Sequence, residues 1–235
     1  MKIFDHNLQV TDPGEKINKM ESRKLPKLNG FLEEALIGII LGDGHLEKRG
    51  RGPNSHALLT ITFAVRYVLL AQYIYGLFIF LVNKKGFRFS EVQSGEGSKY
   101  YGRITVRTVN LPLLTYYHNI FYKLIDNKYK KIIPLNIIDF ITPVSLAFFI
   151  MGDGNYNTVK KVIRLYTNSY TKLEVEYLSK ALNEKLGIRN RIEKEKLNYI
   201  IVIPTSQVPI VQDLVKEHVH PSFYYRIGLQ SLDQI

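Results

Sequence analysis

A short apolar segment that ends in Gly-Asp-Gly occurs twice in this chain. The copies occupy residues 36–44 and 146–154, and both follow the pattern Leu-x-x-[Ile/Phe]-Ile-[Leu/Met]-Gly-Asp-Gly. A single copy is typical of a buried helix that stops at glycine. Two copies indicate a duplicated unit, in which packing of the two helices can bring Asp43 and Asp153 together.

Small residues in the first copy favour close packing of the two expected helices. Gly38 and Gly42 lie four positions apart on one helical face, which permits close approach of two backbones. The second copy has Phe148 where the first has Gly38, so we expect an asymmetric pairing. Parallel packing would place both acids at helix C-terminal ends, where the helix itself contributes negative partial charge.

Two adjacent carboxylates repel each other unless a cation joins them, which suggests a metal site. Cysteine is absent, so thiolate metal sites, cysteine nucleophiles and disulfides are excluded. Hard oxygen ligands favour Mg²⁺ over zinc. A site of this kind can activate water and stabilise the oxygens of a phosphodiester during its displacement.

The overall charge favours a polyanionic partner. The chain has 235 residues, a hydrophobic content of 46% and a formal net charge of +11. Nucleic acid is the leading partner and an anionic membrane surface the second. The most apolar stretch, residues 67–82, is too short to cross a bilayer and contains Gln72, so we expect a buried helix. Without an apolar core in its first twenty residues, the chain is expected to be soluble and intracellular, with no membrane partner.

The pattern along the chain predicts one repeated order of helices and strands. We expect an N-terminal arm (1–28), a first half (29–130), and a linker with the second half (131–235). Apolar periodicity and capping residues predict the following elements: a helix capped by Asn29 and ending near Gly44, strands over 45–51 and 58–66, a helix over 67–82, a strand over 102–110, a helix over 113–124, a link over 128–134, a helix from Thr142-Pro143 to Gly154, a strand over 162–170, a helix over 173–186, a hairpin of 189–193 and 199–203, and a last helix over 209–219.

Basic and polar side chains form rows along the expected strands. Such rows can grip phosphates and read groove edges, although each one alone is equally compatible with an ordinary solvated sheet face. Several rows in a basic, duplicated chain favour double-stranded DNA. The candidate DNA-binding residues are Arg49, Thr60, Thr62, Arg66, Arg103, Thr105, Arg107, Arg164, Tyr166, Asn168, Arg189 and Arg191.

The two copies resemble the LAGLIDADG motif of homing endonucleases, in the single-chain, two-motif (I-SceI-like) branch. Residues 131–134 (Lys-Ile-Ile-Pro) and 142–147 also resemble that branch, and the similarity spans roughly 30–229. Leu41 and Met151 stand where the motif has its first Asp. The metal-binding acid of the family is the last one, and both last acids are present.

The resemblance implies an α/β (α+β), pseudo-twofold duplicated fold in a monomer. Two central packed helices would carry antiparallel sheets that form a saddle over DNA. It also implies divalent-metal-dependent cleavage of both strands of a long target across the minor groove, with 3′ overhangs. Mg²⁺ is the expected cofactor, and Mn²⁺ or Ca²⁺ can occupy the same site.

The resemblance also implies roles for single residues. Asp43 and Asp153 match the family's metal ligands, and the carbonyls of Gly42 and Gly152 are expected to assist them. Basic residues near the two scissile phosphates are matched by Lys131 and by Arg226. Because arginine effectively never loses its proton, Arg226 is expected to stabilise charge or hold a water molecule, not to shuttle protons.

Two functions stay open at this point. One is a site-specific, intron-encoded DNA endonuclease; the other is an RNA maturase on the same fold, with intron RNA as its partner. Sequence does not separate them, because both keep the fold and often the acids. The intact acids argue against an inactive DNA-binding module. Abundant Ile, Lys, Asn, Tyr and Phe, which have AT-rich codons, favour an organelle (mitochondrion or chloroplast) over a microbial cytoplasm.

Overall fold

The structure is a computed structural model that describes residues 28–48, 52, 55–93 and 100–230. Contacts divide the chain into two compact units, which we describe separately. The described part of unit 1 lies within residues 44–118, and that of unit 2 comprises residues 28–43 and 119–230. Of the expected N-terminal arm, only Leu28 is described, and it is buried.

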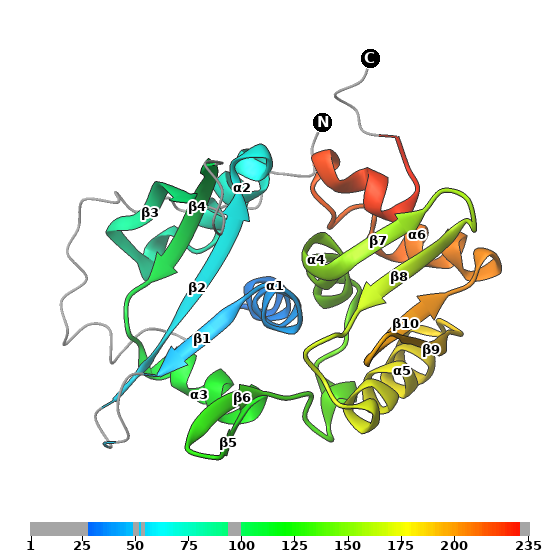
Figure 1. The fold of residues 1–235 in the computed structure, drawn as a ribbon, viewed down its shortest axis with the longest axis horizontal. Coiled ribbons are helices and arrows are strands. Elements are labelled where there is room, and N and C mark those ends of the chain that lie inside the picture. The colour runs from blue at the N-terminus through cyan, green and yellow to red at the C-terminus, as the bar shows by residue number, and fades with distance from the viewer. Residues whose placement is uncertain (1–27, 49–51, 53–54, 94–99, 231–235) are drawn as a thin grey trace. The chain divides into compact units, whose positions relative to one another are not determined.

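Unit 1 contains a four-stranded antiparallel sheet with the order β1-β2-β4-β3 (Figure 1). Helix α2 packs against β2 and β4. The elements of this part of the chain are β1 (His45–Lys48), β2 (Ala57–Ala64), η2 (Val65–Tyr67), α2 (Val68–Leu77), η3 (Ile79–Leu81), β3 (Val82–Gln93), β4 (Tyr100–Thr108) and α3 (Pro112–Phe121), whose last turn belongs to unit 2.

Unit 2 contains a second four-stranded antiparallel sheet, with the order β7-β8-β10-β9, and a separate two-stranded sheet. Its elements are α1 (Gly30–Leu41), β5 (Tyr122–Ile125), β6 (Lys128–Lys131), η4 (Ile137–Asp139), α4 (Pro143–Asp153), β7 (Gly154–Asn157), β8 (Val162–Tyr166), α5 (Lys172–Leu186), β9 (Arg191–Glu195), β10 (Asn198–Ile203), η5 (Thr205–Gln207), α6 (Val208–Val215) and η6 (Pro221–Ile227).

The chain runs twice through the order helix, two strands, helix, two strands, helix. The strand order of the first sheet is repeated in the second, because β7, β8, β10 and β9 correspond to β1, β2, β4 and β3. The expected mixture of helices and antiparallel sheets, duplicated within one chain, is confirmed.

Helices α1 and α4 pack against each other in the core of unit 2. The Asn29 side chain caps α1 by accepting a hydrogen bond from the Leu32 N–H at 3.0 Å, as its sequence predicts. A side chain at Gly38 has no room: an ideal Cβ there would lie 2.2 Å from the Ser145 carbonyl oxygen and 2.7 Å from the Phe148 Cβ. The structure therefore shows both expected features. The two helices approach closely at Gly38, and the contact is asymmetric because α4 has Phe148 at the equivalent position.

The start of α4 is fixed by its own sequence. The Thr142 hydroxyl accepts from the Ser145 N–H at 3.1 Å, and the Ser145 hydroxyl accepts from the Thr142 N–H at 2.9 Å. This reciprocal capping box, followed by Pro143 in the first turn, begins the helix at the expected residue.

Several expected boundaries are wrong. The helix expected over 67–82 ends as α2 at Leu77, and Val82 begins strand β3, which we did not predict. The helix expected over 113–124 ends at Phe121, and the expected link over 128–134 begins as strand β6, paired with β5. No helix in the described part of the chain is long and apolar enough to span a bilayer.

Candidate active site

The C-terminal ends of α1 and α4 meet at two glycines. An ideal Cβ on Gly42 would lie 3.5 Å from the Gly152 Cα, and one on Gly152 would lie 3.5 Å from the Gly42 Cα. The same two positions lie 3.7 Å from Asp153 Oδ2 and from Asp43 Oδ2, respectively. Each carboxylate therefore lies beside the glycine of the opposite helix, and the two predicted acids are brought together.

A basic side chain binds the end of each helix. The Lys131 ammonium donates a hydrogen bond to the Gly42 carbonyl at 2.8 Å. The Arg226 guanidinium donates through Nη1 to the Gly152 carbonyl, and also to the carbonyls of Ile150 at 3.3 Å and Gly154 at 2.9 Å. Both predicted basic residues thus reach the carbonyl that precedes an aspartate, and Arg226 also contacts the carbonyls of Ile150 and Gly154.

Tyr170 is a further residue of the site that sequence reasoning missed. Its buried hydroxyl donates to the Leu41 carbonyl at 2.9 Å, at the end of α1. Burial, chiefly, raises the pKa of Tyr170 well above its usual value, so the phenol stays protonated. No motif marks this tyrosine in the sequence, because its role depends on how the turn after β8 lies against α1.

Both aspartates hold their protons more tightly than free aspartates do. Burial, and then the neighbouring charge of Asp43, raise the pKa of Asp153 to about 6, against the opposing effect of Lys131 and Arg226. Desolvation likewise raises the pKa of Asp43, although it is the more exposed of the two acids and both basic residues oppose the shift.

Lys131 shows the opposite shift. Burial lowers the pKa of its ammonium to about 8, although the charges of Asp153 and Asp43 favour the protonated form. The site therefore contains an amine whose pKa lies near 8 at one helix end and, at the other, a guanidinium, Arg226, that keeps its charge.

The donor set fits a hard divalent cation. Two carboxylates whose pKa values are raised lack full charge compensation, and a cation between them would supply it. The carbonyls of Gly42 and Gly152 already accept bonds from Lys131 and Arg226, but each oxygen has a second lone pair. Within the described ranges no cluster of three or more His, Cys, Asp or Glu side chains that could hold a metal ion is present.

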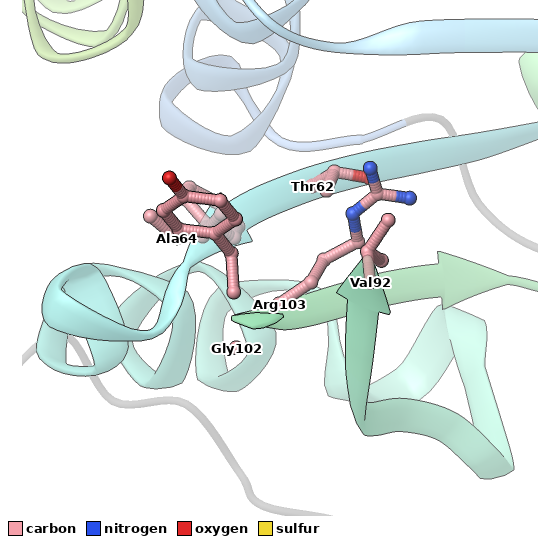
Figure 2. A pocket seen from close by; sticks show the side chains of 7 residues that line it. Thr62, Ala64, Val92, Gly102 and Arg103 are labelled. Atoms are coloured by element: carbon pink, nitrogen blue, oxygen red, sulfur yellow. The ribbon is translucent and has the colours of Figure 1, made fainter. Parts of the chain in front are cut away.

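Five candidate DNA-binding residues of unit 1 lie on one face of its sheet. Thr60 pairs with Arg107 and Thr62 with Thr105 across β2 and β4. Arg103, on the same face, extends toward Thr62 over a hollow of about 360 Å³ (Figure 2). The structure therefore brings together five of the predicted side chains.

Strand β3 extends this face with two residues that we did not predict. Arg88 pairs with Thr105, and Ser90 with Arg103. The alternation of Phe87, Arg88, Phe89 and Ser90 could have identified them, but the apolar pattern of the preceding helix obscured it.

Two of the candidates in unit 1 lie in other surroundings than expected. Arg66 lies in η2 and not on a strand, with its guanidinium 4.8 Å from the Tyr67 ring. Arg107 forms an ion pair with Glu47 at 3.1 Å, which neutralises part of the basic face. Arg49 lies outside the described residues.

The corresponding face in unit 2 is less polar than its sequence suggests. Arg164 and Tyr166 on β8 share it with Arg191 on β9, but Ile200 and Val202 lie buried between them on β10. Asn168 lies in the turn after β8, and Arg189 in the segment before β9, so the prediction that these two lie on strands is wrong.

The duplicated helix-and-sheet architecture, with paired acids at the ends of two packed helices, defines the class of two-motif homing endonuclease folds. The sequence profile of the LAGLIDADG DNA endonuclease family matches residues 33–211, and the chain belongs to this family.

Solved and curated proteins show the same similarity. The homing endonuclease I-WcaI, solved bound to its DNA recognition sequence, matches with a TM-score of 0.81 and 26% identity, covering 96% of this chain and 97% of that one. A probable intron-encoded endonuclease 1 of Wickerhamomyces canadensis is 29% identical over 224 residues, 92% of this chain and 91% of that protein.

A maturase is also similar to the chain. Cytochrome b mRNA maturase bI2 of Saccharomyces cerevisiae is 26% identical over 231 residues, which is 94% of this chain. The chain spans about half of that relative, 52% of its length.

Proposed function

We propose that this chain is a site-specific homing endonuclease, encoded within an intron, that makes a metal-dependent double-strand break in a long DNA target. One observation carries the proposal: Asp43 and Asp153 face each other at the ends of α1 and α4, each beside a glycine whose carbonyl binds a basic side chain. The net charge of +11 and the similarity to a DNA-bound homing endonuclease support it.

Asp43 and Asp153 would hold the divalent cation, for which Mg²⁺ is our proposal, with Gly42 and Gly152 contributing their carbonyls. When bound, such a cation stabilises charge on the phosphodiester oxygens and lowers the pKa of water. The fit of two adjacent carboxylates with raised pKa values to a hard cation supports this assignment.

Lys131 and Arg226 would divide the remaining work at the two strands. With its pKa near 8, a fraction of Lys131 is neutral and can accept a proton from the water that attacks phosphorus. Arg226 cannot accept a proton, and it would stabilise negative charge at the other scissile phosphate.

The decisive test uses plasmid DNA that carries the uninterrupted insertion junction of the intron encoding this chain. Purified protein should linearise it in Mg²⁺ or Mn²⁺, and Asp43→Asn or Asp153→Asn should abolish cutting while DNA binding survives. Unchanged cutting by both variants would place the site elsewhere. Absence of cutting by the unmodified protein, together with tight binding of intron RNA, would exclude the endonuclease.

An RNA maturase is the second candidate, and similarity to the yeast maturase over 94% of this chain favours it. The partner would then be the intron RNA, with or without DNA cleavage. Splicing of the intron transcript in vitro, with and without the protein, separates this function from cleavage because the Asp43→Asn variant should retain it.

We also propose that the chain acts as a monomer in an organelle. A single chain supplies both acids and both basic residues, so no second copy is required for a complete site. The halves at residues 29–130 and 131–235 would be the duplicated units. Sedimentation of the protein, and the position of its gene inside a mitochondrial or chloroplast intron, test these statements.

A further inference from the structure

Strands β5 and β6 form a tight hairpin that is separate from both large sheets. Tyr122 pairs with Lys131, Lys123 with Lys130, Leu124 with Tyr129, and Ile125 with Lys128. The turn consists of Asp126 and Asn127, whose φ values of 50° and 60° match the two-residue turns that suit the twist of a hairpin.

The register gives this hairpin two different faces. Directly opposed residues point to the same side, and successive residues alternate. Tyr122, Lys131, Leu124 and Tyr129 therefore share one face. The other face carries Lys123, Lys130, Lys128 and Ile125.

The first face begins at the two aspartates and leads away from them. At its base Tyr122 is 5% exposed, and the Lys131 ammonium reaches the Gly42 carbonyl. One pair further along, Leu124 is 45% exposed and Tyr129 is 37% exposed. An apolar pair thus meets solvent next to the proposed catalytic centre.

The base of the hairpin is fixed to unit 2. The Ile132 N–H donates to the Phe121 carbonyl at 2.8 Å, which continues the ladder beyond Lys131. The next N–H, of Ile133, donates to Glu174 on α5 at 3.2 Å. Because both anchors adjoin Lys131, the orientation of the hairpin face is tied to the position of the site.

A cross-strand pair such as Leu124 and Tyr129 also stabilises the hairpin itself. Stabilising the hairpin does not by itself account for the positive charge that the hairpin carries. The hairpin carries four lysines against one acid, Asp126, which already lies 3.7 Å from Lys130. The hairpin thus combines an exposed apolar pair, on the face that continues from the aspartates, with three lysines on the opposite face. This combination matches a nucleic acid, which offers sugar surfaces between rows of phosphates.

We propose that the β5–β6 hairpin grips DNA: Leu124 and Tyr129 pack against the minor groove, and the long side chains of Lys123, Lys128 and Lys130, which start from the opposite face, reach past the strand edges to the flanking phosphates. The inference rests on the proposed function, since the DNA is placed by the aspartates. Two residues along a strand span about 7 Å, or about two base steps of DNA. The hairpin therefore holds the duplex within a few base pairs of the scissile phosphate beside Lys131.

The charge contribution is tested by changing Lys123, Lys128 and Lys130 together to Gln. A matched control changes Lys172, Lys180 and Lys185, three exposed lysines of α5, to Gln, with the same loss of net charge. Affinity for a random duplex of about 40 base pairs is measured against salt. Each lost phosphate contact lowers the slope of log affinity against log salt by about 0.9, so we expect a decrease of about two to three in the hairpin variant and little change in the control.

The apolar contact is tested independently by photocrosslinking. A benzophenone amino acid replaces Tyr129 in one protein and Leu173, an exposed residue of α5, in the other. We expect crosslinks to the duplex from position 129 and none from position 173. A Leu124→Thr and Tyr129→Thr double variant, which keeps strand-forming residues, should bind the duplex about tenfold more weakly at a temperature well below its melting temperature, which should fall by only a few degrees.

The outcomes separate this inference from the proposed function. Suppose that the unmodified protein binds duplex DNA with a steep salt slope. The hairpin proposal alone is then wrong if the slope decreases equally in the hairpin variant and in the α5 variant, or if position 129 gives no crosslink. If the unmodified protein shows no salt-dependent duplex binding, the endonuclease function fails with it. Loss of binding only to a structured RNA or to anionic vesicles also overturns the DNA assignment.

Discussion

The carboxylates of Asp43 and Asp153 lie close together, and their ionisation costs stability. The folded state raises the pKa of Asp153 to about 6, above the value of an unfolded aspartate near 4. A group whose pKa is raised on folding favours the folded state below its unfolded pKa, and this contribution is lost as pH rises through the folded pKa. Without metal, the ionised pair therefore destabilises the protein above about pH 6.

We predict that Asp153→Asn stabilises the metal-free protein at neutral pH. Removing the charge removes the cost of burying it and the repulsion from Asp43, which together we expect to contribute about 1 kcal/mol, or about 2–4 °C in melting temperature. The gain should shrink at a pH near 4.5, where Asp153 is protonated anyway. Thermal melts in a chelator at both pH values check it, with Asp213→Asn, an exposed acid, as the control. A lower melting temperature than that of the unmodified protein at neutral pH would show that the pair is not repulsive.

Lys131 should set the alkaline part of the pH profile. Its pKa of about 8 means that the neutral amine increases as pH rises through that value. We expect strand cleavage served by Lys131 to increase over the same range, and Lys131→Arg to lower the rate about a hundredfold and remove the dependence, since arginine keeps its charge. Single-turnover cleavage from about pH 6.5 to 9 measures this. A profile unchanged by the substitution would mean that Lys131 takes no part in proton transfer.

At the level of elements, the α1–α4 contact allows no side chain at Gly38. Gly38→Ala would place a Cβ 2.2 Å from the Ser145 carbonyl oxygen, so the helices must separate. We expect a loss of about 1–3 kcal/mol, together with reduced cleavage because Asp43 and Asp153 move apart. Gly76→Ala in α2 is the matched control: nothing lies within 4 Å of its ideal Cβ, and the better helix former should add up to about 1 kcal/mol. Urea titrations measure the free energy of unfolding of both variants. Equal changes in that free energy for Gly38→Ala and Gly76→Ala would contradict the packing argument.

The ion pair between Glu47 on β1 and Arg107 on β4 limits the charge of the unit 1 sheet face. Glu47→Gln should release Arg107 to a phosphate, raise the affinity for random duplex DNA several-fold and steepen the salt slope by about one. Glu176→Gln on α5 makes the same change in net charge as a control. Equal affinities of the two variants would show that only the overall charge matters.

The elements that were predictable are those whose signals lie within a few residues of one another. Asn29, and Thr142 with Ser145, mark the helix starts, and the apolar runs that follow are long enough to be unambiguous. Strand β3 was missed because its first residue, Val82, continues the apolar run of the preceding helix. The β5–β6 hairpin was missed because its turn, Asp126-Asn127, lacks the usual glycine at a position with positive φ.

The residues of the site that a sequence motif marks could be predicted, and the others could not. Asp43 and Asp153 were predicted from the duplicated pattern, and Lys131 and Arg226 from the family resemblance; the structure places all four at the ends of the two motif helices. The bond from Tyr170 to the end of α1 depends on tertiary packing, which no local pattern encodes.

Over the whole molecule, duplication has produced two halves that are alike in order but not in chemistry. The sheets repeat one strand order, and each motif helix ends at a carbonyl bound by a basic side chain. In the first motif that side chain is a lysine that donates to the Gly42 carbonyl and whose pKa is lowered to about 8. In the second it is an arginine that bridges the carbonyls of Ile150, Gly152 and Gly154.

This asymmetry predicts that the two DNA strands are cut at different rates. Arg226 holds the junction of α4 and β7 and cannot exchange a proton, so the strand that it serves should be cut more slowly. A nicked intermediate should accumulate before linear product appears. Arg226→Lys should restore a titratable amine and bring the two rates closer, at some loss of stability because an ammonium does not stack as a planar guanidinium does on the Phe223 ring, whose centroid lies 5.1 Å from the Arg226 Cζ. Strand-specific end labels on the target measure both rates. Equal rates in the unmodified protein, or a rate difference that Arg226→Lys leaves unchanged, would show that the two halves are catalytically equivalent despite this substitution.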